Sequence, residues 1–172
     1  MTTQIALLRG INVGGNNIIP MSKLREMCII LGLTEVRTYI QSGNIVFKSD
    51  LNEHEVCAKL EKSLETELGK HISVLIRSAE ELESVLSKNP FSGFNPAQVG
   101  ISFFTQLFPE NYLNDFVNPG PEEIVVSGRE IYIHYPNGMG QSKLKLPKLP
   151  KQGTARNLNT VAKLVEMSRE NK

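Results

Sequence analysis

The chain has 172 residues, of which 40% are hydrophobic and 22% charged, a composition typical of a folded protein of one ordinary domain or two small ones. It contains no apolar run of about 18 residues or more and no basic leader with a cleavage site, which argues against a membrane span and a secretory signal. Its two cysteines, Cys28 and Cys57, lie in apolar helical patterns without metal-ligand spacing. We therefore expect reduced thiols and a cytoplasmic protein.

The net charge of +1 is spread unevenly along the chain. Residues 139–172 contain eight lysines and arginines and two glutamates, a charge of +6, so that residues 1–138 carry −5. Such a basic tail either attracts an anion or pairs with acidic groups of the same protein. Both interpretations stay open at this point.

Local signals in the first half predict six elements in the order β-α-β-β-α-β. Pro20 and Gly32 bracket a helix, and Asn52 with Glu55 resembles a capping box that opens a second helix, which runs to Gly69. The short segment 42–44 contains a glycine and joins two strands as a β-hairpin. The predicted strands are residues 5–9, 36–41, 45–48 and 72–77, and the first helix covers 21–31. This order is that of the ferredoxin-like split βαβ arrangement.

The second half begins with a third helix, capped by Ser78 and Glu81 and ending at Asn89 before Pro90. Residues 89–98 are rich in Pro, Gly, Ser and Asn and are the best candidate for a domain joint, which gives domains at 1–90 and 91–172 that could also form one unit.

After the joint, the pattern partly recurs. It predicts strands at 99–105, 124–127 and 130–135 and a short helix at 109–116. A last helix follows Thr154, with Leu158, Val161, Ala162 and Val165 on one face. The predicted fold class is therefore α+β: a ferredoxin-like βαββαβ module, a second, smaller α+β module and a C-terminal helix.

One face of the first predicted sheet is not an ordinary solvent face. Strand alternation places Arg37, Tyr39 and Gln41 together with Leu75 on the side away from the helices. Leu7 and Arg9 of the first predicted strand are expected on the same side. This mixed face could pack on the second module or hold a ligand between the modules, and the two roles are compatible.

Three polar strings could bind an anion. In the loop after the first strand, glycines would let the backbone approach a phosphate and Arg9 would add a charge-assisted contact, although turn geometry alone also uses Gly and Asn. In TARNLNT, Thr154 to Thr160, polar groups stand at a predicted helix start, where they either favour an anion or act as ordinary caps. In GMGQSKL, Gly138 to Leu144, Ser142 and Lys143 either bind phosphate or belong to a solvated loop.

No catalytic or metal-binding constellation stands out in the sequence. The three histidines form no metal-ligand pair, and no nucleophile–base pair can be named. The sequence assigns no cofactor and no metal, and leaves open whether the protein is an enzyme. Base stacking of nucleic acid is not expected, because residues 5–9 contain no aromatic and Phe47 should face the helices, whereas phosphate contact by the tail stays open.

Three strings resemble a known bacterial family. They are LLRGINVGGNN followed by IPMSKLR, then VRTYIQSGNIVF, and finally SKL with GTARNLNTVAKL, and they run in order from near residue 5 to near residue 165. Together they resemble the family catalogued as domain of unknown function 1697. The resemblance implies a cytoplasmic bacterial α+β protein with ferredoxin-like elements and no assigned activity.

The leading hypothesis is binding of, or enzymatic action on, a small anionic ligand, phosphorylated or nucleotide-like, at a site between the modules. The candidate ligand-binding residues are Arg9, Asn12, Gly14, Gly15, Arg37, Gln41, Ser42, Asn44, Ser142, Lys143, Thr154, Arg156 and Asn157. A second hypothesis is a protein-interaction module or homodimer without a small ligand. A third is a non-specific nucleic-acid binder whose affinity falls with salt. A membrane partner is not expected.

Overall fold

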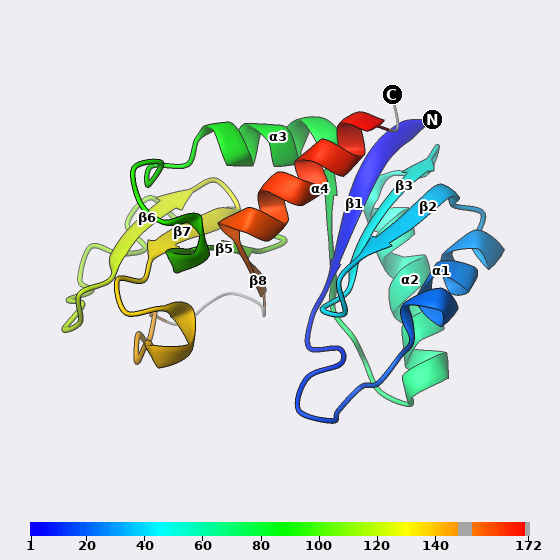
Figure 1. The fold of residues 1–172 in the computed structure, drawn as a ribbon, viewed down its shortest axis with the longest axis horizontal. Helices are drawn as coiled ribbons and strands as arrows, with labels where there is room; N and C mark the ends of the chain where they lie inside the picture. The colour runs from blue at the N-terminus through cyan, green and yellow to red at the C-terminus, as the bar shows by residue number, and fades with distance from the viewer. Residues whose placement is uncertain (148–152, 171–172) are drawn as a thin grey trace. The chain divides into compact units, whose positions relative to one another are not determined.

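Two antiparallel sheets of four strands, together with helices, make up the computed structural model, which describes residues 1–147 and 153–170 (Figure 1). This confirms the predicted α+β class. Contacts along the chain group into two units. Unit 1 contains Met1–Ser84 and the chain from Lys163 onward, and unit 2 contains Val85–Ala162. Among the described residues, no helix is long and apolar enough to cross a membrane.

Unit 1 contains the six elements that the sequence predicts, in the predicted order. They are β1 (Thr2–Leu8), α1 (Met21–Ile30), β2 (Thr34–Tyr39), β3 (Asn44–Ser49), α2 (Glu53–Leu68) and β4 (Val74–Ser78). The strands pair antiparallel in the order β2-β3-β1-β4. The capping box is confirmed, because the Asn52 side chain accepts from the Glu55 N–H while the Glu55 carboxylate accepts from the Asn52 N–H.

In the first sheet, both faces of the strand β1 are buried. Ala6 and Leu8 of β1 join the core formed with α1 and α2, which lie on one side of the sheet (Figure 1). Ile5 and Leu7 alternate with them and are also fully buried. On this second face, Arg37 of β2 hydrogen-bonds to α4 (Leu158–Glu170). The mixed face expected from the sequence therefore packs, at least in part, against the end of the chain.

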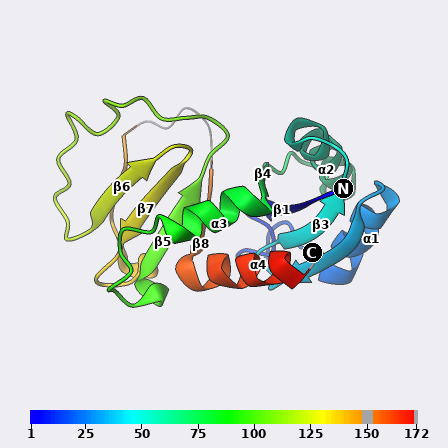
Figure 2. The same ribbon diagram turned by 90° about the horizontal axis from the view of Figure 1, so that it is seen from above.

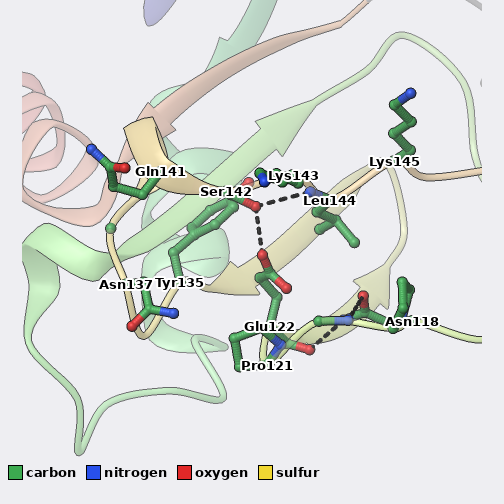
Figure 3. Close-up of a pocket in the computed structure, with 13 residues that line it drawn as sticks. Asn118, Pro121, Glu122, Tyr135, Asn137, Gln141, Ser142, Lys143, Leu144 and Lys145 are labelled. Carbon is green, nitrogen blue, oxygen red and sulfur yellow. Dashed lines mark hydrogen bonds between the residues drawn. The ribbon is translucent and has the colours of Figure 1, made fainter.

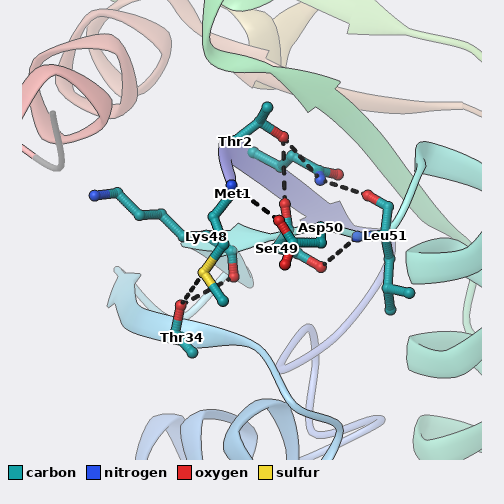
Figure 4. Close-up of polar contacts among 8 residues, drawn as sticks. Met1, Thr2, Thr34, Lys48, Ser49, Asp50 and Leu51 are labelled. Atoms are coloured by element: carbon teal, nitrogen blue, oxygen red, sulfur yellow. Dashed lines mark hydrogen bonds and ion pairs between the residues drawn. The ribbon is translucent and has the colours of Figure 1, made fainter.

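Side chains tie the start of β1 to the end of β3 (Figure 4). Gln4 donates to the carbonyl oxygen of Leu51 at 2.9 Å, and the Leu51 N–H donates to the Ser49 hydroxyl at 3.0 Å. Thr2 donates to the Ser49 carbonyl oxygen at 3.4 Å. These bonds satisfy the backbone where the chain leaves the sheet and turns into α2.

Unit 2 contains a second sheet in the order β6-β7-β5-β8, and Figure 2 shows β6, β7 and β5 side by side. Its strands are β5 (Val99–Phe103), β6 (Glu123–Ser127), β7 (Glu130–His134) and β8 (Thr154–Asn157). Two short 3-10 turns, Pro96–Gln98 and Met139–Gln141, flank the sheet. The boundary between the units falls inside α3 (Ala79–Ser87) and again inside α4.

The helix predicted at residues 109–116 does not form. The backbone instead makes successive turns, with N–H groups of Tyr112, Asn114 and Phe116 donating to carbonyls three residues earlier. The physical reason is side-chain packing: Tyr112 lies against Phe108 with ring centroids 4.8 Å apart, and its hydroxyl donates to the Pro147 carbonyl oxygen at 2.8 Å. These contacts anchor the segment within unit 2 in a conformation of successive turns.

The last helix begins later than predicted, at Leu158 rather than directly after Thr154. Residues Thr154–Asn157 form β8, which pairs antiparallel with β5. Pairing with a strand distant in sequence decides that these residues form a strand and not a helix, because β5 then has a neighbour on each side, β7 and β8. Ala162, expected on the apolar face, is exposed, whereas Leu158, Val161 and Val165 are buried as predicted.

Candidate functional site

The glycine-rich loop after β1 is a tight turn. Gly14 and Gly15 have φ values of +57° and +78°, and the Asn16 N–H donates to the Val13 carbonyl oxygen at 2.9 Å. Positive φ at both central residues is the geometry of a type I′ turn, which favours glycine. The turn therefore accounts for both glycines, and their proposed contact with a ligand stays a prediction.

Asn12 holds this loop to the next one. Its side chain donates to the carbonyl oxygens of Ile19 and Gln41 at 3.0 and 2.9 Å and accepts from the Ile19 N–H at 2.9 Å. Gly43 approaches Ile11 so closely that an added Cβ would lie 2.5 Å from the Ile11 Cδ1 atom. The structure thus brings together the loops of two predicted groups, one carrying Arg9, Asn12, Gly14 and Gly15 and the other Gln41, Ser42 and Asn44.

Two side chains of unit 1 that were predicted to bind a ligand form hydrogen bonds with other groups of the protein. Asn44 is fully buried and donates to the Tyr39 carbonyl oxygen at 2.9 Å and to the Ser42 hydroxyl at 3.1 Å. Arg37 donates to the Glu170 carboxylate at 2.6 Å and to the Met167 carbonyl oxygen. Their observed contacts stabilise the β2–β3 connection and the attachment of α4.

Thr154, Arg156 and Asn157 of unit 2 lie in a strand and not, as predicted, in the first turn of a helix. Arg156 is 7% exposed and donates to the Thr154 hydroxyl at 2.7 Å and to the Ala155 carbonyl oxygen at 2.9 Å. Burial lowers the pKa of Arg156 to about 10. Asn157 caps α4, because its side-chain oxygen accepts from the Thr160 N–H at 2.9 Å. That these residues share one site with Arg9 stays a prediction.

Pairing within the fold accounts for part of the basic tail. Lys163 pairs with Glu166 at 3.3 Å, and Arg169 pairs with Glu83 at 2.9 Å. The remaining lysines of the tail divide into two sets. Lys143 and Lys145 line a cavity described next, whereas Lys148, Lys151 and Lys172 lie outside the described residues.

The predicted residues Ser142 and Lys143 line a cavity of about 430 Å³ in unit 2. Three segments form it: residues 118–122 before β6, residues 135–138 after β7, and residues 141–145. Figure 3 shows the side chains of Glu122, Ser142 and Tyr135 converging in it. The cavity therefore contains both signs of charge, from a glutamate and from Lys143 and Lys145.

Glu122 is the centre of the polar network in this cavity. Its Oε1 atom accepts from the Ser142 hydroxyl at 2.6 Å (Figure 3), and its Oε2 atom is buried without a hydrogen-bond partner among the residues that the structure describes. The bond from Ser142, together with the Glu122 N–H, lowers the pKa of the carboxyl group. Burial, and then the charge of Glu122, raises the pKa of the Tyr135 hydroxyl.

An asparagine and a glycine position Glu122. The Asn118 side chain donates to the Glu122 carbonyl oxygen at 2.7 Å and accepts from the Gly120 N–H at 3.0 Å. A Cβ on Gly120 would lie 2.3 Å from the Glu122 Oε2 atom, so the carboxylate occupies the space that a side chain would take. The turn 118–122 thus fixes the carboxylate in the cavity.

Sequence reasoning did not identify Glu122, Tyr135 or Asn118. The available signal was the Pro- and Gly-rich run NPGPE, residues 118–122, directly before a predicted strand. No group of three or more His, Cys, Asp or Glu side chains suited to a metal ion occurs within residues 1–147 and 153–170. The cavity can offer a charged acceptor, hydroxyl groups and ammonium groups to a small polar molecule.

Comparison with known proteins confirms the resemblance noted in the sequence. Residues 1–132 match the family model described as "Protein of unknown function (DUF1697)". The structure is similar to that of the conserved bacterial protein SP0830 from Streptococcus pneumoniae, with a TM-score of 0.77 and 26% sequence identity over 97% of this chain and 98% of that chain. No curated protein matches the sequence. Neither description names a ligand or a reaction.

Proposed function

The chain belongs to the DUF1697 family of proteins of unknown function, and from this premise we propose that it binds a small anionic ligand that also carries hydroxyl groups, such as a phosphorylated sugar or a nucleotide, in the cavity of unit 2. The cavity supports this better than the three arginines of the leading hypothesis do. Arg37 and Arg156 both donate to protein oxygens, whereas Lys143 lines a cavity that a ligand can fill.

The observation that carries the proposal is the Oε2 atom of Glu122. It is buried in a cavity wall and has no donor among the described residues. A buried acceptor without a donor costs free energy, so a ligand that draws the Glu122 side chain toward the cavity and donates a hydroxyl or amino hydrogen to it is favoured. The lowered pKa keeps the carboxyl group ionised at neutral pH, which makes this hydrogen bond charge-assisted.

Lysines supply the preference for an anionic group. Lys143 and Lys145 line the cavity, and neither forms an ion pair with any described residue. A ligand that pairs with both kinds of charged side chain needs a hydrogen-bond donor for the Glu122 carboxylate and an anionic group for the ammonium groups of the lysines. The volume of about 430 Å³ lies within the range of about 300–1,000 Å³ that is usual for small-ligand sites.

Thermal unfolding in the presence of phosphate, sulfate, mononucleotides and sugar phosphates tests the proposal. A ligand at about one hundred times its Kd should stabilise the protein by about 2.7 kcal/mol, or roughly 5–10 °C in Tm. Glu122→Gln and Lys143→Gln should each lose most of this shift. Lys88→Gln, which changes an exposed lysine outside the cavity, should keep it. No shift with any compound, or equal shifts in all three variants, would show that the cavity is not the site.

A further inference from the structure

A groove between α1 and α2 of unit 1 has features that the proposed ligand site does not use. Its volume is about 530 Å³, and its walls come from one face of each helix. Lys23, Met27 and Ile30 lie on the α1 side, at spacings of four and three residues that place them on one helical face. Lys59 and Lys62 are followed by Thr66 on the α2 side at comparable spacing. The groove therefore runs along both helices for about two turns, or roughly 10 Å.

The floor of the groove is apolar. Met27 is almost fully buried, and Leu31 lies half-buried beside it. Ile30 is 76% exposed and its neighbour Ile29 is 58% exposed, so large apolar side chains meet solvent at this end of α1. Exposed apolar side chains next to a groove are typical of a surface that binds another protein.

The rim of the groove is basic. Lys23, Lys59 and Lys62 line it together with one glutamate, Glu67. None of their three ammonium groups forms an ion pair or hydrogen bond with another residue of the described part of the chain. Lysines that remain unpaired beside an apolar floor are complementary to a partner with an apolar stripe between acidic side chains.

We propose that this groove binds an acidic amphipathic helix of a partner protein. The apolar stripe of that helix packs on Met27, Ile30 and Leu31, and its carboxylates pair with the lysines. A concave surface of this kind fits a helix better than the flat surface of a bilayer. The groove lining contains no aromatic side chain on which bases could stack, which favours a protein partner over single-stranded nucleic acid.

The probe for this proposal is a fluorescein-labelled helical peptide of about 14 residues, or four turns, with leucines on one face and glutamates on the flanks. A peptide with lysines in place of the glutamates and a scrambled acidic peptide serve as controls. We expect the acidic peptide alone to bind the full chain in a polarisation titration, more weakly at about 200 mM than at about 50 mM salt. Lys59→Glu with Lys62→Glu should weaken binding by about tenfold or more.

The matched control reverses an exposed lysine that does not line the groove, Lys88→Glu, and should bind like the unchanged protein. Ile30→Gln, on an exposed position, tests the apolar contact and should also weaken binding without loss of the folded circular-dichroism spectrum. Equal binding of the acidic and scrambled peptides, or full binding by the double reversal, would overturn the proposal. Binding of phosphatidylglycerol vesicles or a short RNA that the double reversal abolishes, without peptide binding, would overturn it in favour of those partners.

Discussion

The hydroxyl group of Tyr132 provides a direct test of how unit 2 is stabilised. Tyr132 on β7 is 1% exposed, and its hydroxyl donates to the Val85 carbonyl oxygen at 2.6 Å. Val85 lies in the last turn of α3, where carbonyls have no partner within the helix. Tyr132→Phe removes the donor and leaves a buried acceptor unsatisfied, which should lower the free energy of unfolding by about 1–3 kcal/mol.

Urea unfolding followed by circular dichroism measures this loss. We expect a lower midpoint with an unchanged slope and a Tm that falls by about 2–4 °C per kcal/mol. The control is Tyr39→Phe, because the Tyr39 hydroxyl forms no hydrogen bond with described residues, and it should change the free energy by less than about 0.5 kcal/mol. An equal change in both variants would refute the assigned role of the Tyr132 hydroxyl.

The same variant has a distinct signature at high pH. Burial, and then the charge of Glu130, raises the pKa of Tyr132 from 10.0 to about 12. Because the unfolded state releases this proton first, the contribution of Tyr132 is present below pH 10 and is lost as the pH rises from about 10 to 12. The difference in stability between the protein and Tyr132→Phe should therefore shrink over this range.

Three further substitutions follow from close contacts and burial. Gly43→Ala should lower the free energy of unfolding by about 2–3 kcal/mol in a urea titration, because φ is +87° and the new Cβ would lie 2.5 Å from Ile11; a loss below about 0.5 kcal/mol would contradict this contact. Burial raises the pKa of Cys28 from 9.0 to about 12, so stability should fall as pH rises through this range, and Cys28→Ala should flatten that part of the profile. Gly120→Ala should push the Glu122 carboxylate aside and weaken ligand binding by calorimetry about tenfold, and an unchanged Kd would count against the role of Glu122.

Unit 1 could be predicted well because its elements carry their own boundary signals. The Asn52–Glu55 capping box and Gly69, which ends α2 at φ +77°, depend only on residues close in sequence. They can therefore be recognised from the sequence, and the structure contains both. Strand alternation also identified the face of β1 that packs on the helices. Strand alternation also placed Arg37 on the mixed face of the sheet, but it did not predict that α4 would supply the hydrogen-bond partners of Arg37.

Unit 2 was harder to predict because distant pairings decide its structure. Residues Thr154–Asn157 have the polar character of a helix cap, yet they form a strand that pairs with β5. The cavity illustrates the same limit. Ser142 could be selected from its neighbours in sequence, but its partner Glu122 stands 20 residues earlier, and only the hairpin of β6 and β7 brings them together.

The path of the chain through α4 has a consequence for the order of folding during synthesis. Unit 1 begins with Met1 but needs the residues from Lys163 onward, and Arg37 finds its partner Glu170 only 133 positions later. At a translation rate of about 5–20 residues per second, the first sheet waits several seconds for the helix that supplies this partner. During that interval one apolar face of an otherwise assembled sheet is incompletely covered. The nascent chain is therefore expected to be more prone to aggregation, and more dependent on chaperones, until the residues from Lys163 onward have been synthesised.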